Sequence, residues 1–122
     1  MGLLDILLNN MAEEPKSNGM SSLKEAYLGE KAPQDPGVYK VFYKNQLMKV
    51  GKAEDGLRKR FSDYYRTKTG GTAGLQFITM ANRDDVYVAW SICEKDKCRR
   101  IEKELYDKAK REGKELPWSE RR

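Results

Sequence analysis

The sequence predicts an α+β domain with a small three-stranded antiparallel sheet flanked by helices. Two runs rich in β-branched and aromatic residues lie close together at 38–43 and 47–50, and a third, alternating run follows at 86–93. Helical patterns lie after the second and third runs, so the predicted order is β-β-α-α-β-α. At 122 residues, one domain is the natural count. We place that domain at 33–122, after an N-terminal extension at 1–32.

The extension is expected to contain short helices and a linker. Residues 3–8 are apolar enough for a short helix, and 13–20 contain proline, serine, asparagine and glycine, which predicts a flexible linker. Ser22 and Glu25 fit a capping box, so a second short helix is expected to begin there and run through Tyr27.

The first two strands are expected to form a hairpin, and the loop length decides its register. A three-residue loop at 43–45 pairs Tyr39 with Lys49 across the hairpin. A loop one residue shorter pairs Tyr39 with Val50 and puts Lys49 on the other face. We favour the longer loop, because it needs a left-handed residue and Asn45 tolerates that conformation.

Helices account for most of the remaining chain. Asp55 is expected to cap a helix over 56–68, a short helix fits 75–80 after a glycine-rich segment, and the last helix is expected over 96–112. The apolar stripe of the first of these helices has the spacing of one buried face and consists of Leu57, Phe61, Tyr64 and Tyr65.

The composition of the chain narrows the classes of function that it can have. Charged residues make up 35% of the chain and the net charge is +5, which permits a polyanionic partner. No apolar run reaches the ~18 residues of a membrane span, and the apolar start lacks the features of a signal peptide. We therefore expect a cytoplasmic protein that acts away from membranes.

The two cysteines, Cys93 and Cys98, fit a reducing compartment. The chain has no histidine, so this pair alone cannot complete a tetrahedral zinc site. Both are expected to be buried or half-buried thiols without chemistry.

Three blocks of sequence carry a family resemblance. They are Gly-Val-Tyr at 37–39, Lys-Val-Gly-Lys-Ala at 49–53 and Leu-Arg-Lys-Arg-Phe-Ser at 57–62. Together they closely resemble the GIY-YIG nuclease family, above all the N-terminal domain of the bacterial excision-repair nuclease subunit. The resemblance covers about residues 33–110 and shares the β-β-α-α-β-α order. It implies a metal-dependent DNA endonuclease that hydrolyses phosphodiester bonds.

The resemblance also assigns site residues. Tyr39 matches the family's first tyrosine, Lys52 its lysine after the second glycine, and Glu102 its metal-binding glutamate. The helix arginine matches Arg60 if Gly56 is counted as an insertion, and otherwise matches Arg58.

Two departures from the family pattern stand out. Lys49 occupies the position of the second tyrosine, and the family's late asparagine has no match in 114–118.

The residue chemistry fits these assignments. Tyr39 would take a proton from the attacking water, and Lys49 and Lys52 would lower its pKa by favouring the phenolate. The planar fork of Arg60 suits a phosphate, and the Glu102 carboxylate suits Mg²⁺ or Mn²⁺. These five residues are therefore expected to converge as a catalytic set on one concave surface, with Glu102 on the same side of the sheet as Tyr39.

DNA is the expected partner, contacted by Arg58, Lys59 and Arg66 on the basic helix. No small-molecule cofactor is expected. One alternative is a degenerate GIY-YIG-like module that binds nucleic acid without cleaving it. Another is a small interaction domain that forms a homodimer through its apolar N-terminal segment.

Overall fold

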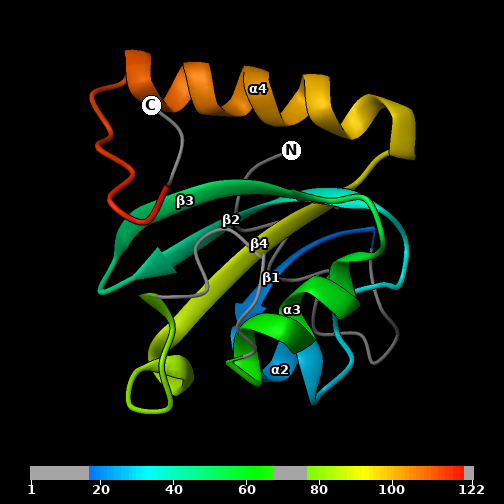
Figure 1. The fold of residues 1–122 in the computed structure, drawn as a ribbon, viewed down its shortest axis with the longest axis vertical. Coiled ribbons are helices and arrows are strands. Elements are labelled where there is room, and N and C mark those ends of the chain that lie inside the picture. The colour runs from blue at the N-terminus through cyan, green and yellow to red at the C-terminus, as the bar shows by residue number, and fades with distance from the viewer. Residues whose placement is uncertain (1–16, 68–76, 120–122) are drawn as a thin grey trace.

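The computed structural model describes residues 17–67 and 77–119. They form one antiparallel four-stranded sheet in the order β1-β4-β2-β3, with helices on both faces (Figure 1). The strands are β1 (Asn18–Ser22), β2 (Gly37–Tyr43), β3 (Gln46–Ala53) and β4 (Val86–Ile92). The helices are α2 (Leu23–Tyr27), α3 (Leu57–Tyr65), the 3₁₀ turn η2 (Arg83–Asp85) and α4 (Lys95–Arg111). The α+β class is confirmed, with one strand more than predicted.

The additional strand is β1, which pairs with β4 and places Gly19 opposite Trp90. The linker prediction is therefore wrong for 18–20, because pairing with β4 outweighs the weak strand propensity of this polar segment. The predicted N-cap is confirmed, since the Ser22 Oγ accepts a hydrogen bond of 3.1 Å from the Glu25 N–H. The N-terminal segment expected to form a helix and to support a homodimer lies outside the described residues.

The hairpin register differs from both predictions. A two-residue turn with positive φ at Lys44 and Asn45 joins the strands, and a β-bulge lies beyond Val41. Tyr39 consequently pairs with Gly51, and Lys49 pairs with Val41. Lys49 still shares the face of Tyr39, because directly paired residues point to the same side of a sheet.

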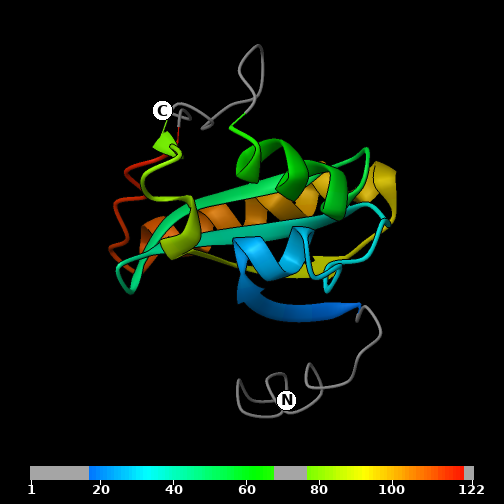
Figure 2. The same ribbon diagram turned by 90° about the horizontal axis from the view of Figure 1, so that it is seen from below.

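The helices lie on opposite faces of the sheet. Figure 2 shows α2 and α3 in front of the sheet and α4 behind it, and α4 packs on β2 and β3. The predicted stripe of α3 is confirmed, since all four of its residues are buried against the sheet. A smaller apolar cluster, which includes Val50 and Ala109, joins α4 to the other face.

The start of α3 corrects one expectation. Gly56, with φ of 122°, precedes the helix, and no side chain caps it, so the predicted Asp55 cap is wrong. Backbone carbonyls of the segment between α2 and β2 accept from the first helical N–H groups instead: Leu57 N–H donates to Asp35 at 2.9 Å and Arg58 N–H to Pro33 at 3.0 Å.

The other helix predictions have mixed outcomes. The last helix runs within one residue of its predicted bounds. Of the helix predicted at 75–80, the described part at 77–80 contains no α-helix. No helix in the described ranges has the length and apolar character needed to cross a membrane.

Gly51→Ala should destabilise the fold by about 1–3 kcal/mol through overpacking, because a Cβ at this position would lie 2.5 Å from the Tyr39 ring. Urea unfolding of the variant measures the loss. In a Tyr39→Leu background the same change should cost less, since the shorter side chain no longer crosses β3. An equal cost in both backgrounds would contradict this account of the glycine.

Candidate active site

Tyr39 lies flat across the outer strand of the hairpin. Its side chain is 1% exposed, and a Cβ at Gly51 would lie 2.5 Å from both the Cζ and the Oη atoms of the ring. Only glycine at this position lets the hydroxyl pass over β3. The glycine of the second sequence block therefore has a steric role, which is to place the Tyr39 hydroxyl.

The Tyr39 hydroxyl belongs to a hydrogen-bonded cluster with α3. It lies 2.6 Å from the Tyr64 hydroxyl, and the Arg60 guanidinium hydrogen-bonds with both phenols. Edge-on contacts with Phe61 and Tyr64 hold the Tyr39 ring, at centroid distances of 5.4 and 5.9 Å. The structure therefore brings the predicted pair Tyr39 and Arg60 together.

Tyr64 is the member of this cluster that sequence reasoning missed, because its place on the apolar stripe of α3 marked it only as core. Two signals were available. Tyr64 lies four residues after Arg60 on a helix, which puts the two on adjacent turns. A buried tyrosine hydroxyl also needs a hydrogen-bond partner.

Burial controls the ionisation of the cluster. Desolvation, followed by the neighbouring Tyr64, raises the pKa of Tyr39 well above its ordinary value of 10.0, and Arg60 only partly offsets this. Burial alone would lower the pKa of Arg60, but Tyr39 and Tyr64 raise it above its ordinary value. The expectation that Lys49 and Lys52 lower the pKa of Tyr39 is therefore wrong, because burial dominates and neither lysine contributes a resolved effect.

The two lysines of the second block point to opposite faces. Lys49 is 9% exposed and lies on the α3 face, two residues from Gly51. Lys52 pairs with Val38 and lies on the α4 face, where its Nζ is 3.1 Å from the Glu54 carboxylate.

Glu102 is 7% exposed on the inner side of α4, in line with the buried Cys98 and Ala109. Because α4 and α3 cover opposite faces, the expectation that Glu102 shares the sheet face of Tyr39 is wrong (Figures 1 and 2). Lys52 and Glu102 form an α4-side group, and Tyr39, Lys49 and Arg60 form an α3-side group. In the described sheet β3 is an outer strand, so one phosphate can contact both groups only around the β3 edge.

The basic side chains of α3 differ in their surroundings. Arg58 donates from Nε to the Ala32 carbonyl at 2.9 Å, which ties its guanidinium to the loop after α2. Lys59 is exposed and lies 3.8 Å from the Asp63 carboxylate, and Arg66 is exposed at the end of α3. Lys59 and Arg66 are thus the accessible members of the predicted DNA-contact set.

No family model and no curated protein matches the sequence. Solved structures match the fold. The GIY-YIG N-terminal endonuclease domain of UvrC from Thermotoga maritima, as an asparagine-to-alanine variant bound to its catalytic divalent cation, aligns with a TM-score of 0.55. The alignment has 22% identity and covers 80% of this chain and 93% of that chain.

This chain has the GIY-YIG fold. The magnesium-bound form of the same UvrC domain aligns with a TM-score of 0.51 and 24% identity, over 71% of this chain and 88% of that chain. The sequence resemblance to this domain is therefore confirmed at the level of the fold.

The raised pKa of Tyr39 has a measurable consequence for stability. The folded protein keeps this phenolic proton above pH 10, where the unfolded chain loses it, so stability is lost as pH rises from about 10 towards the folded pKa. Compared with Tyr39→Phe, the wild type should lose about 1.4 kcal/mol per pH unit in this window. Denaturant unfolding of both proteins between neutral pH and the alkaline limit measures the difference. Parallel stability curves would show that Tyr39 does not titrate abnormally.

Proposed function

We propose that this chain is a metal-dependent DNA endonuclease that hydrolyses phosphodiester bonds. The observation that carries the proposal is the Arg60 guanidinium, held by two buried phenols within a GIY-YIG fold. A nuclease fold similar to a domain that binds a catalytic divalent cation supports the same conclusion.

Arg60 is the proposed phosphate clamp. Its half-buried guanidinium is oriented by Tyr39 and Tyr64 before any substrate arrives. A planar guanidinium binds two phosphate oxygens at once, and a preoriented charge stabilises the transition state without first having to reorganise. The phenols therefore act on the reaction partly through the position of Arg60.

Glu102 is the proposed metal ligand. No group of three or more potential metal-binding side chains exists in the described part of the chain, so a cation at Glu102 would have at most one further protein ligand of this kind among those residues. Mg²⁺ suits such a site, because it keeps several waters and takes one or two carboxylates together with substrate phosphates. Mn²⁺ accepts similar oxygen ligands. Bound there, the cation would supply positive charge beside the scissile phosphate.

Tyr39 is the proposed proton acceptor, with Arg60 stabilising its phenolate. Because its pKa is raised, the phenolate is a small fraction at neutral pH, and the hydrolysis rate should increase as pH rises. Lys49 adds a cation on the same face, and Lys52 adds one on the α4 side. Lys59 and Arg66 are proposed to contact the flanking DNA backbone.

A second function is supported by three specific observations. Lys49 replaces the second tyrosine of the motif, burial raises the pKa of Tyr39, and Glu102 lies across the sheet from Tyr39. These features favour a module that binds DNA without cutting it, so the decisive measurement is cleavage itself.

The wild type should nick supercoiled plasmid in the presence of Mg²⁺ or Mn²⁺ and stop when the metal is chelated. Arg60→Ala should lower the rate by roughly 10²–10³-fold, because it removes a preoriented transition-state contact. Glu102→Gln should reduce nicking and raise the metal concentration required. Arg100→Ala removes an exposed arginine of α4 that pairs with Glu104, so it serves as the matched control and should cut almost normally. Full activity in Arg60→Ala would rule out the proposed clamp.

Substitutions of Lys49 distinguish an enzyme from a binding module. Lys49→Met should slow nicking and leave most DNA binding in a gel shift, since it removes one cation beside the reacting phosphate but only one of many that contact DNA. Lys49→Tyr restores the usual tyrosine and should retain or raise activity. If the wild type binds without cutting and Lys49→Tyr gains cleavage, the natural protein is the binding module. If Lys49→Met cuts as fast as the wild type, Lys49 has no part in catalysis.

A further inference from the structure

Two thiols meet at the junction between β4 and α4. Cys93 directly follows β4, and Cys98 lies in the first part of α4, whose N-cap is Glu94. Their sulfur atoms are 2.8 Å apart, and both cysteines are free. These are the positions, before the N-cap and four residues after it, where two apolar side chains commonly pack to fix the start of a helix.

Contacts with backbone atoms hold both cysteines in place. The Cys93 N–H donates to the Pro36 carbonyl at 3.0 Å, which holds it beside the loop that leads into β2. Cys98 is 0% exposed and its sulfur also lies 3.8 Å from the Cys93 carbonyl oxygen. A bond between the two sulfurs therefore needs little movement of the backbone.

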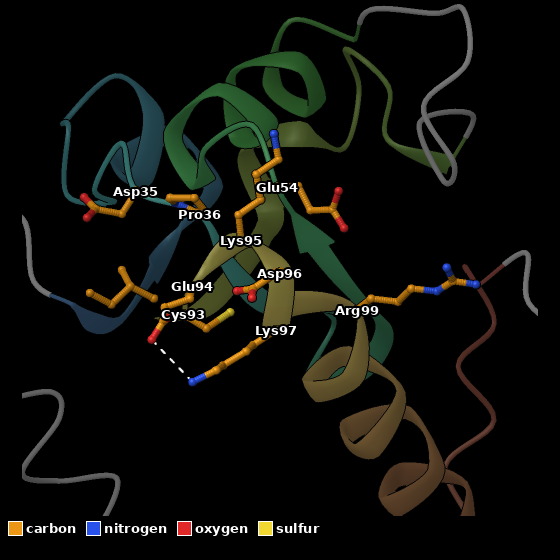
Figure 3. Close-up of a pocket in the computed structure, with 10 residues that line it drawn as sticks. Asp35, Pro36, Glu54, Cys93, Glu94, Lys95, Asp96, Lys97 and Arg99 are labelled. Carbon is orange, nitrogen blue, oxygen red and sulfur yellow. Dashed lines mark hydrogen bonds and ion pairs between the residues drawn. The ribbon is translucent and has the colours of Figure 1, made fainter.

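The two thiols differ in access to solvent. Cys93 is half-buried and lines an open hollow of about 1130 Å³ with Glu54, Lys97 and Arg99 (Figure 3). Burial, with the hydrogen bond between the two thiols, raises the pKa of Cys98 to about 12. A small reagent therefore reaches Cys93 first, and Cys98 is held protonated beside it.

We infer that Cys93 and Cys98 form a redox-active pair that a hydroperoxide converts into a reversible disulfide. The Cys93 sulfur attacks the peroxide, the O–O bond breaks, and Cys93 becomes a sulfenic acid as water or an alcohol leaves. The Cys98 sulfur then attacks the Cys93 sulfur, and the sulfenic oxygen leaves as water after taking up the Cys98 proton. The two thiols lose two electrons to the peroxide, and a dithiol reductant reverses the step.

The disulfide would replace a packing contact by a covalent one at the start of α4. Glu102 lies one turn beyond Cys98, so the bond would anchor the helical segment that leads to it. This effect belongs to the β4–α4 junction and does not depend on nuclease activity.

Treatment of the whole chain with hydrogen peroxide, followed by mass spectrometry, tests the inference. The wild type should lose the mass of two hydrogen atoms, lose both thiols to maleimide labelling and remain monomeric on a non-reducing gel. Dithiothreitol should restore both thiols.

Two variants make the test specific. Cys98→Ala should stop at a sulfenic acid on Cys93, which dimedone traps, and Cys93→Ala should leave the buried Cys98 almost unreactive in the native state. In the oxidised wild type, amide exchange at 95–98 should slow. Wild type that accumulates sulfenic or sulfinic acid, forms only intermolecular dimers, or keeps both thiols while Cys98→Ala is oxidised would overturn the inference.

Discussion

The contact between the Tyr39 and Tyr64 hydroxyls, 2.6 Å apart, is the interaction on which the site depends. It connects the inner strand β2 to α3, and the Arg60 guanidinium interacts with both phenols. A lost buried hydrogen bond typically costs about 0.5–1.5 kcal/mol, so replacement of either phenol removes one hydrogen bond from the other. The contact also requires that β3 carry no side chain where the ring crosses it, which links Gly51 to the chemistry of a helix on the same face.

Local patterns predicted most of the fold. The stripe of α3, the alternation of β4 and the extent of α4 follow from helical and strand periodicity, and Ser22 and Glu25 marked the start of α2. The hairpin register did not follow from the loop alone. The Met48 carbonyl, beside the bulge, accepts a hydrogen bond of 2.9 Å from Trp118 N–H, a partner from the far end of the chain. The length of the hairpin loop gives no information about that contact.

The site could be predicted from the sequence to a similar extent. Spacing within one element places Arg60 near the edge of a buried helix face, and motif blocks bring Tyr39 beside it. Spacing does not tell which face of the sheet a later helix covers, and this is why Glu102 was expected on the wrong side. Tyr64 was missed for a different reason, since its apolar ring fits the core pattern, and its spacing from Arg60 and its buried hydroxyl were the signals that marked it as more than core.

The division of the polar residues between two faces limits what Lys49 can do. An ammonium group donates hydrogen bonds and attracts phosphate, but it accepts no proton while it is charged. With lysine in place of the second tyrosine, the α3-side group holds two cations, Lys49 and Arg60, and among the residues of the described cluster the phenols of Tyr39 and Tyr64 are the groups that can accept a proton. Burial keeps one of these, Tyr39, in its neutral form. Within the proposed function, the substitution would therefore favour attraction of the DNA backbone over activation of water, and cleavage would depend on how well Arg60 stabilises the Tyr39 phenolate.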